Sequence, residues 1–286
     1  MRTIAHLSDV HFGAADPRIV DALVRAVTAL APDLVAVSGD LTQRARRWQF
    51  ERAREFLAQL PRPQIVVPGN HDVPLYHALA RFAWPLHYYR KYITADLHPY
   101  FEDDAIAVMG ANTTRSFTIA DGGLTTGEVT KISARLETLS RDVLKVVVCH
   151  HPFELPRTRS GRWTRPRPDP AAIATLTGKG ADVFLTGHLH IGYAGETAVR
   201  YKGGGRVAIV VEAGTAASTR RRGEPNSFNV LRAAAGRITV ERRTWNEIAR
   251  QFVPGVSKSF HRSGDGWVPD HNDGGPTGMS TAPLSE

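Results

Sequence analysis

The sequence is poor in cysteine and has no long apolar runs. Its 286 residues include one cysteine, Cys149, so no disulfide can form within the chain and a cysteine-rich structural zinc site is excluded. No stretch approaches the roughly 18 consecutive apolar residues that a membrane span requires. The N-terminal segment places Asp9 and His11 where a signal peptide needs apolar residues. We therefore expect a soluble, cytoplasmic protein with no transmembrane segment.

Acidic residues are fewer than basic residues. The chain has 28 Asp and Glu against 36 Lys and Arg, which gives a formal net charge of +8. A basic balance favours anionic partners such as phosphates, nucleic acid or an acidic membrane surface, and the total charge does not choose among them. An arginine-rich proteome would give the same imbalance.

Short apolar runs alternate with longer amphipathic stretches over the first 190 residues. Residues 3–8 are typical of a strand, and a helix is predicted next, because Asp16 is a good N-cap and Pro17 suits the first helical position. The same reasoning predicts further strands at 33–40, 64–72, 105–112, 144–151 and 181–188, and further helices at 44–60, 124–139 and 169–176. This order indicates mainly parallel strands with covering helices.

The pattern changes after Gly192. Residues 197–214 and 227–245 resemble two hairpins with glycine turns, which predicts antiparallel pairing at an edge or in a second sheet. From about Pro254 to the end, Gly, Ser, Pro and Asp dominate, so we expect a mobile tail over residues 254–286.

Polar side chains follow five of the predicted strands. In an open α/β sheet, the carboxyl ends of the strands converge on the ligand crevice, so these side chains are expected to meet. They are Asp9 and His11, then Asp40, then Asn70, His71 and Asp72, then His150 and His151, then His188 and His190.

These side chains are of the kinds that bind first-row divalent cations. Carboxylate, imidazole and amide oxygen suit Mn, Fe, Zn or Co. The set is larger than one ion can use, and two ions sharing a bridging carboxylate would account for the excess. Glycines precede Asp40, Asn70 and His188, which allows tight turns and close approach of the backbone to a cation.

The five motifs in this order resemble the calcineurin-like metallophosphoesterase superfamily. They read Asp-x-His from Asp9, Gly-Asp at Asp40, Gly-Asn-His-Asp around Asn70, His-His-Pro from His150 and Gly-His-x-His from Gly187. The resemblance implies a four-layer αββα sandwich with mixed sheets and helices on the outer faces. Residues 1–253 would form its catalytic domain.

The resemblance also implies a role for each ligand. One metal ion would be held by Asp9, His11 and His190, and the second by Asn70, His150 and His188. Asp40 would bridge the two ions, and His71 would act as general acid for the leaving oxygen or stabilise its charge.

The implied activity is hydrolysis of a phosphodiester by attack of a metal-bridging hydroxide. The second motif lacks the later aspartate usual in Ser/Thr protein phosphatases, which leaves no obvious group to orient His71. The compact layout is most similar to bacterial class III cyclic nucleotide phosphodiesterases, so a small phosphorylated substrate is expected. The alternatives are a pyrophosphatase acting on a UDP-linked acylated sugar, a nuclease, and a non-catalytic nucleic-acid binder.

Three regions offer further candidate contacts. Arg157, Arg159 and Trp163 directly follow the His150 motif and would grip phosphate or stack on a base, or else form a solvated loop. Arg222, in an arginine triplet, is open to the same two interpretations. The aromatic run at residues 82–92 would either supply core side chains or accommodate an amphiphilic substrate.

Three residues near the motifs are expected to play supporting parts. His151 is expected beside the ligand His150 without binding metal itself, and Cys149 is expected to pack within its strand. Asp72 would either steady its turn or orient His71.

Overall fold

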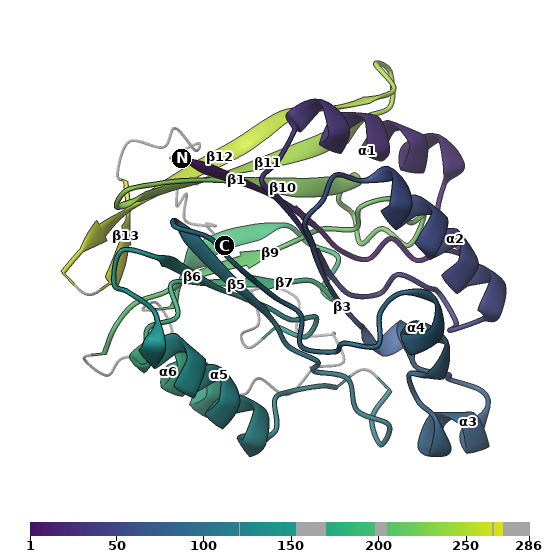
Figure 1. Ribbon diagram of the computed structural model, residues 1–286. Helices are drawn as coiled ribbons and strands as arrows, with labels where there is room; N and C mark the ends of the chain where they lie inside the picture. The colour runs from purple at the N-terminus through teal and green to yellow at the C-terminus, as the bar shows by residue number, and fades with distance from the viewer. Residues whose placement is uncertain (120, 153–169, 198–204, 265, 271–286) are drawn as a thin grey trace, which may run out of the picture.

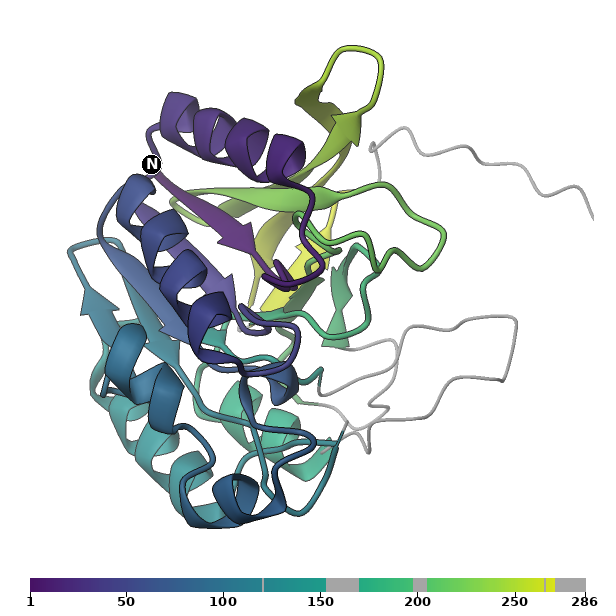
Figure 2. The same cartoon turned by 90° about the vertical axis from the view of Figure 1, so that its right-hand side faces the viewer.

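Two mixed β-sheets stack face to face between two layers of helices (Figure 1). The computed structural model describes residues 1–119, 121–152, 170–197, 205–264 and 266–270. Figure 2 shows the layers from the side, with purple α1 (Pro17–Leu30) at the top and teal helices at the bottom. The predicted αββα architecture is confirmed.

The first sheet has seven strands in the order β13-β12-β11-β10-β1-β2-β3. Its parallel part joins three of the predicted strands, β1 (Arg2–Leu7), β2 (Leu34–Ser38) and β3 (Gln64–Val67). The remaining strands pair antiparallel: β10 (Ser227–Ala234), β11 (Arg237–Asn246), β12 (Gln251–Ser263) and β13 (Gly266–Pro269). The hairpin predicted at 227–245 is therefore present.

The second sheet has six strands in the order β4-β5-β6-β7-β9-β8. Its four central strands run parallel: β5 (Ile106–Gly110), β6 (Leu144–Val148), β7 (Val183–Thr186) and β9 (Ile209–Glu212). The antiparallel edge strands are β4 (Tyr100–Glu102) and β8 (Tyr193–Glu196). The second predicted hairpin thus begins earlier than expected, since the strand paired with β9 precedes Thr197.

Helices cover the outer faces of both sheets (Figure 1). They are α1 and α2 (Arg47–Gln59) over the first sheet and α5 (Thr126–Thr138) and α6 (Pro170–Gly178) over the second, while the short helices α3 (Ala78–Ala83) and α4 (His87–Tyr92) lie at the edge of the sandwich next to α2. Helix α1 begins as predicted, with Pro17 at its start and the Asp16 carboxylate accepting a hydrogen bond from the amide of Arg18. Among the described helices, none is long and apolar enough to cross a bilayer.

Three apolar layers hold the sandwich together. Ile4, Val67 and Val146 belong to the layer between the sheets, which strands of both sheets fill. A second layer packs the first sheet against α1 and α2, and a third packs the other sheet against α5 and α6. Alternate residues of one strand supply different layers, so both faces of β1 and β2 are buried. The strand ends that carry the polar motifs are thereby held between packed layers.

The tail expected from Pro254 begins later than the sequence indicates. Residues 251–263 form β12, and Gly266–Pro269 form β13. Phe260 and Trp267 are both 1% exposed and fill the layer between the sheets. Pro254 lies where the register with β11 shifts, a place where a strand tolerates proline. The boundary at residue 254 is thus wrong, and residues 271–286 lie outside the described part of the chain.

The aromatic run at residues 82–92 divides between core and surface. Tyr89 and Tyr92 are buried against α2, as expected of core side chains. Phe82 and Trp84, in and directly after α3, are 55% and 62% exposed. The interpretation as core aromatics therefore holds for Tyr89 and Tyr92, while Phe82, Trp84 and Tyr88 are exposed.

Replacing the buried indole near the C-terminal edge tests the corrected boundary. We expect Trp267→Ala to lower the free energy of unfolding by about 3–5 kcal/mol, since it opens a cavity between the sheets and removes a hydrogen bond to Asp182. The measurement is urea unfolding followed by circular dichroism. Val256→Ala, on an exposed stretch of β12, is the control with an expected change under about 0.5 kcal/mol. Equal stability of the two variants would contradict a structural role for this segment.

Candidate metal centre

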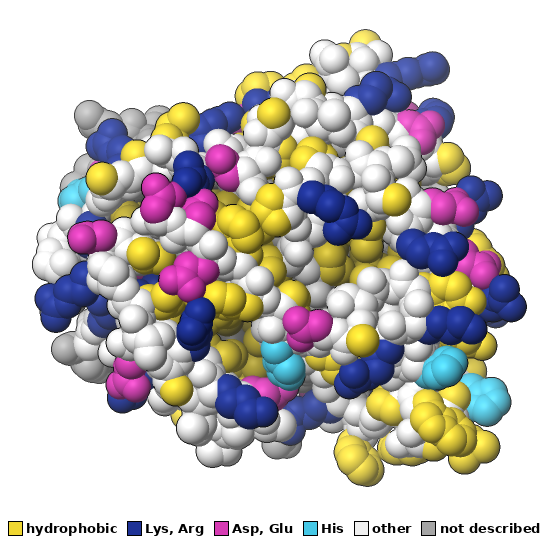
Figure 3. Space-filling view, in the orientation of Figure 1, with side chains coloured by type: hydrophobic (Ala, Val, Ile, Leu, Met, Phe, Trp, Pro, Cys, Tyr) yellow, Lys and Arg dark blue, Asp and Glu magenta, His cyan; other side chains and the backbone are white. Residues whose placement is uncertain are grey.

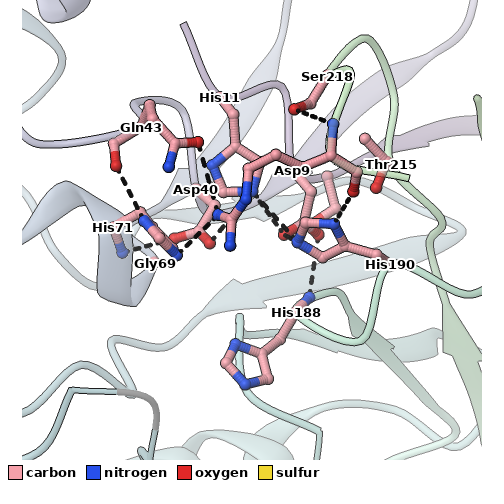
Figure 4. Close-up of polar contacts among 12 residues, drawn as sticks. Asp9, His11, Asp40, Gln43, Gly69, His71, His188, His190, Thr215 and Ser218 are labelled. Atoms are coloured by element: carbon pink, nitrogen blue, oxygen red, sulfur yellow. Dashed lines mark hydrogen bonds and ion pairs between the residues drawn. The ribbon is translucent and has the colours of Figure 1, made fainter. Parts of the chain in front are cut away.

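The carboxyl ends of strands from both sheets deliver the predicted side chains to one place (Figure 4). The residues follow β1, β2 and β3 of the first sheet and β6 and β7 of the second. Seven of them were predicted as ligands, and all seven meet there: Asp9, His11, Asp40, Asn70, His150, His188 and His190. Most are fully buried, including Asp9 at 0% and Asp40 at 1% exposure.

One group of ligand atoms comprises Asp9, His11, Asp40 and His190. These atoms lie within 4.8 Å of one another. The His190 Nε2 atom is 3.1 Å from Asp9 Oδ1 and 3.2 Å from His11 Nε2. Two carboxylates and two imidazoles at this spacing could hold one divalent cation.

A second group comprises His150, His151 and His188. Asn70 joins it, since its Oδ1 atom lies 3.0 Å from His150 Nε2 and 2.9 Å from His188 Nδ1. Asp40 lies between the two groups, with Oδ2 3.6 Å from His11 Nε2 and 3.4 Å from His150 Nε2. Two buried His/Asp clusters joined by one carboxylate are consistent with a binuclear metal site.

Backbone carbonyls fix the orientation of three imidazole rings. The Nδ1 atom of His150 lies 2.8 Å from the carbonyl oxygen of Ser38, and that of His190 lies 2.7 Å from the carbonyl oxygen of Arg220. His11 Nδ1 is similarly placed on the Thr42 carbonyl at 3.3 Å. A carbonyl only accepts, so each Nδ1 carries a proton, and in the neutral ring that a metal ion requires each Nε2 directs a lone pair into the centre.

The donor atoms left facing the centre fit a cation. The Nε2 atoms of His11 and His190 lie 3.2 Å apart, and in these tautomers neither has a proton to share. Asp9 Oδ1 is buried without a hydrogen-bond donor. Converging lone pairs of this kind repel one another unless a positive charge lies among them.

The backbone at the ligands is left-handed at five non-glycine residues. Asp9, His11, Asp40, His188 and His190 have φ between 52° and 73°. Such a conformation costs of order 1 kcal/mol or more per residue and clusters at functional sites. The tight packing of the core holds it in place.

Two glycines allow the turns to approach each other. A Cβ atom at Gly69 would overlap the Asp40 carboxylate and amide, and one at Gly187 would overlap Ser8 and lie 2.7 Å from Asp9 Oδ2. The same close approach lets the amide of His71 donate to Asp40 Oδ1 and the amide of His188 donate to Asp9 Oδ2. Each carboxylate thus has one oxygen held by an amide and the other directed to the centre.

Opposite charges inside the centre set its protonation. Burial alone would raise the pKa of Asp40, but the neighbouring His150 and His71 hold that pKa well below its ordinary range. Burial lowers the pKa of His150, and the Asp40 carboxylate outweighs burial and raises it to about 9. Burial lowers the pKa of His188 to about 3, with the charge on His150 adding to the effect. The buried carboxylates therefore require positive charge beside them.

His71 lies at the edge of the centre in a short 3₁₀ helix, η1 (Asn70–Asp72). Its Nδ1 atom is 2.9 Å from the carbonyl oxygen of Gln43, and its Nε2 atom is 3.1 Å from Arg220 Nη1. Burial lowers the pKa of His71, so the ring is neutral at pH 7, with Nδ1 donating and Nε2 accepting. The group that orients His71 is a main-chain carbonyl, which residue identity in the sequence cannot reveal.

Asp72 steadies the turns around His71. Its two carboxylate oxygens accept hydrogen bonds from the amides of Gly69, Leu41 and Thr42 and from the Thr42 hydroxyl, at 2.8–3.2 Å. Burial and the nearby Asp40 raise the pKa of Asp72 to about 6. Of the two predicted roles, the contacts favour the steadying of the turn.

His151 and Cys149 follow the same strand. His151 Nδ1 lies 2.8 Å from Thr113 Oγ1, while its Nε2 is buried without a hydrogen-bond partner. The ring lies inside the second cluster rather than only behind it. Cys149 packs in the core beneath α5 and α6, and burial raises the pKa of its thiol.

The structure describes one of the four predicted substrate-binding residues, Arg222. Arg157, Arg159 and Trp163 lie outside the described residues. Arg222 is half-buried, and burial lowers its pKa. Arg220 reaches the centre instead: its carbonyl holds His190, and its guanidinium contacts His71 and lies 3.5 Å from Gln43 Oε1. The arginine triplet was the available signal, and the sequence does not indicate which member points inward.

Comparison with known proteins identifies a family and a similar fold. The calcineurin-like phosphoesterase family matches residues 2–192. The glycerophosphodiester phosphodiesterase GpdQ of Enterobacter lignolyticus is 35% identical over 80 residues, which cover 24% of this chain and 29% of that protein. The purple acid phosphatase PPD1 from yellow lupin has a similar fold, with a TM-score of 0.68 and 13% identity over 90% of this chain and 53% of its own. The chain thus spans about half or less of these two proteins.

The steadying role of Asp72 is tested by a substitution that removes one acceptor oxygen. We expect Asp72→Asn to lower the free energy of unfolding by about 2–3 kcal/mol, because an amide group placed beside two backbone amides leaves buried donors unpaired. Chemical unfolding measures the change, with Asp142→Asn at an exposed position as the control. A wild-type stability for Asp72→Asn would show that these hydrogen bonds do not anchor the turn.

Proposed function

Since the chain belongs to the calcineurin-like phosphoesterase family, we propose that it is a phosphodiesterase that uses two divalent metal ions. The observation that carries the proposal is the position of Asp40. Its carboxylate lies between two clusters of buried imidazoles, within 3.6 Å of a ring nitrogen in each. A shared carboxylate is the arrangement that a two-metal phosphoester hydrolase requires.

The predicted ligand sets fit the donor atoms of the two clusters. Asp9, His11 and His190 would hold one ion, and the second would be held by Asn70, His150 and His188, with Asp40 common to both. The mixed nitrogen and oxygen donors suit Mn, Fe, Zn or Co. Two such ions, when bound, lower the pKa of a bound water and neutralise phosphate oxygens.

His71 and Arg220 then act at the open edge of the centre. The Arg220 guanidinium donates to the neutral His71 ring, a weaker partner than an anionic phosphate. A bound phosphodiester attracts the guanidinium away and leaves the Nε2 atom of His71 free. The negative charge of the substrate also raises the pKa of the ring, which can then take up a proton and donate it to the leaving oxygen.

A phosphodiester is the proposed substrate class, with a cyclic nucleotide or a similar small molecule as the first candidate. The layout of the five motifs resembles class III cyclic nucleotide phosphodiesterases, and the relative matched over 80 residues is named for a glycerophosphodiester substrate. The second candidate is a UDP-linked acylated sugar. It is favoured by the exposed aromatic side chains of Phe82 and Trp84, which would contact an acyl chain.

The proposal predicts metal-dependent diester hydrolysis. Protein loaded with Mn is expected to hydrolyse bis(p-nitrophenyl) phosphate, and Asp40→Asn is expected to lose about 10³-fold in kcat together with bound metal. His71→Ala is expected to lose about 10²-fold in kcat and to keep its metal, as measured by elemental analysis. Absence of diesterase activity with every first-row metal would overturn the proposal. Cyclic AMP, a UDP-linked lipid and a phosphomonoester, assayed in parallel, distinguish the substrate classes.

The contribution of Arg220 to substrate binding can be tested against its neighbour in the sequence, Arg221. We expect Arg220→Ala to raise KM for the diester by about tenfold, because a charge-assisted contact to phosphate is lost. Arg221, which is exposed one residue away, provides the control Arg221→Ala with unchanged kinetics. Metal content should stay the same in both variants, since the carbonyl that holds His190 is retained. An equal effect of both substitutions would mean that only the general positive charge matters.

A further inference from the structure

An exposed apolar face lies around α3, beside the candidate centre. Twelve large hydrophobic side chains are exposed among the described residues, and seven of them lie in two short segments. Their exposure ranges from 37% to 90%. Figure 3 shows apolar side chains and histidines gathered at the lower right, where Figure 1 places α3 and α4. We name these seven side chains the α3 face: Tyr76, Leu79, Phe82, Trp84, Tyr88, Phe117 and Ile119. Apolar side chains concentrated in this way mark an interaction site more often than an ordinary surface.

The buried side chain of Arg81 joins the segment that contains α3 to the segment around Phe117. Arg81 is 6% exposed, and its guanidinium donates to the carbonyl oxygens of Pro74, Ser116 and Thr118. The rings of Phe82 and Phe117 lie against each other with centroids 5.5 Å apart. The exposure of these side chains is therefore built into the packing of α3 against residues 116–118.

The two segments that form the α3 face carry charged residues of one sign. Residues 73–95 and 111–119 contain no aspartate or glutamate, while they include Arg90, Lys91 and Arg115. Arg44 adds a further cation, with its guanidinium 5.4 Å from the centre of the Tyr76 ring. The partner that complements this surface is apolar within and anionic at its boundary.

The α3 face borders the candidate centre. The side-chain amide of Asn70 donates to the carbonyl oxygen of Ile119 at 3.1 Å. The chain also runs directly from His71 and Asp72 through Pro74 into Tyr76. Whatever covers this face therefore lies beside the opening of the centre.

We propose that the α3 face docks on an anionic lipid bilayer. Tyr, Trp and Phe side chains prefer the boundary between headgroups and acyl chains, and Lys and Arg beside them contact lipid phosphates. A second copy of the chain fits less well, because a self-complementary contact would place the same cations against one another. Single-stranded nucleic acid fits less well, because Leu79 and Ile119 offer no ring on which a base could stack. Docking would place the centre at the headgroup layer, and it does not depend on the proposed phosphodiesterase activity.

Vesicle sedimentation tests the docking without any substrate. The full chain is expected to sediment with vesicles of equal parts phosphatidylglycerol and phosphatidylcholine, and far less with phosphatidylcholine alone. Phe117→Ser and Trp84→Ser should each weaken partitioning at least about tenfold, since each removes one large side chain from the bilayer. The matched control is Ile248→Ser, which removes a side chain 96% exposed elsewhere on the molecule and should leave partitioning unchanged. Circular dichroism confirms that each variant is folded.

Other outcomes would overturn the proposal. These are absence of binding to anionic vesicles, or equal binding by Phe117→Ser and Ile248→Ser. Two parallel measurements identify a different partner. Loss of single-stranded DNA binding in Phe117→Ser alone would assign the face to nucleic acid, and loss of a dimer in analytical ultracentrifugation would assign it to a second copy. Diesterase activity assayed on a soluble substrate separates these results from failure of the proposed function.

Discussion

The burial of two carboxylates, those of Asp9 and Asp40, determines how the other groups of the centre are arranged. Asp9 and Asp40 lie at the bottom of the site, and burial of an isolated charge is costly unless opposite charge lies beside it. Each uses one oxygen to accept an amide from another motif, His188 for Asp9 and His71 for Asp40. The second oxygen of each faces Nε2 atoms of imidazoles whose Nδ1 protons are held by backbone carbonyls, so the carboxylates are left to positive charge, carried by protonated rings or by cations.

The fold supplies the rigidity that this arrangement needs. The ligands stand on turns with left-handed backbone, and the amides and carbonyls that hold them come from neighbouring strand ends. Moving one strand by an ångström would misplace both a ligand and the group that orients another ligand. The three apolar layers prevent this movement, since each strand that carries a ligand is packed on both faces. Local strain at the ligands is thus offset by burial elsewhere.

The sequence predicts the layers and the meeting of the motifs because both depend on side-chain identity and spacing. It misplaces the end of the domain, because Gly, Ser and Pro around residues 254–266 mask two strands that each bury a large anchor, Phe260 in β12 and Trp267 in β13. It also misses the partner of His71, since a Gln43 carbonyl looks like any other main-chain group. Which arginine of the triplet contacts His71 depends on the direction of the loop, and tertiary packing decides that direction; the sequence therefore does not show that it is Arg220 rather than Arg222.

The net charge of +8 does not identify a partner, whereas the location of the charges on the folded chain does favour one. Averaged over the surface, it fits an arginine-rich composition as well as any specific partner. In the folded chain, one cation faces the opening of the centre at Arg220, and several surround an apolar face on the adjoining wall without an acidic neighbour in those segments. An anionic headgroup beside the α3 face and an anionic phosphoester at the centre would be attracted by the same side of the molecule. Electrostatic attraction decays within about 10 Å at moderate salt, so this proximity, rather than the total charge, would bring an anionic surface and the centre together.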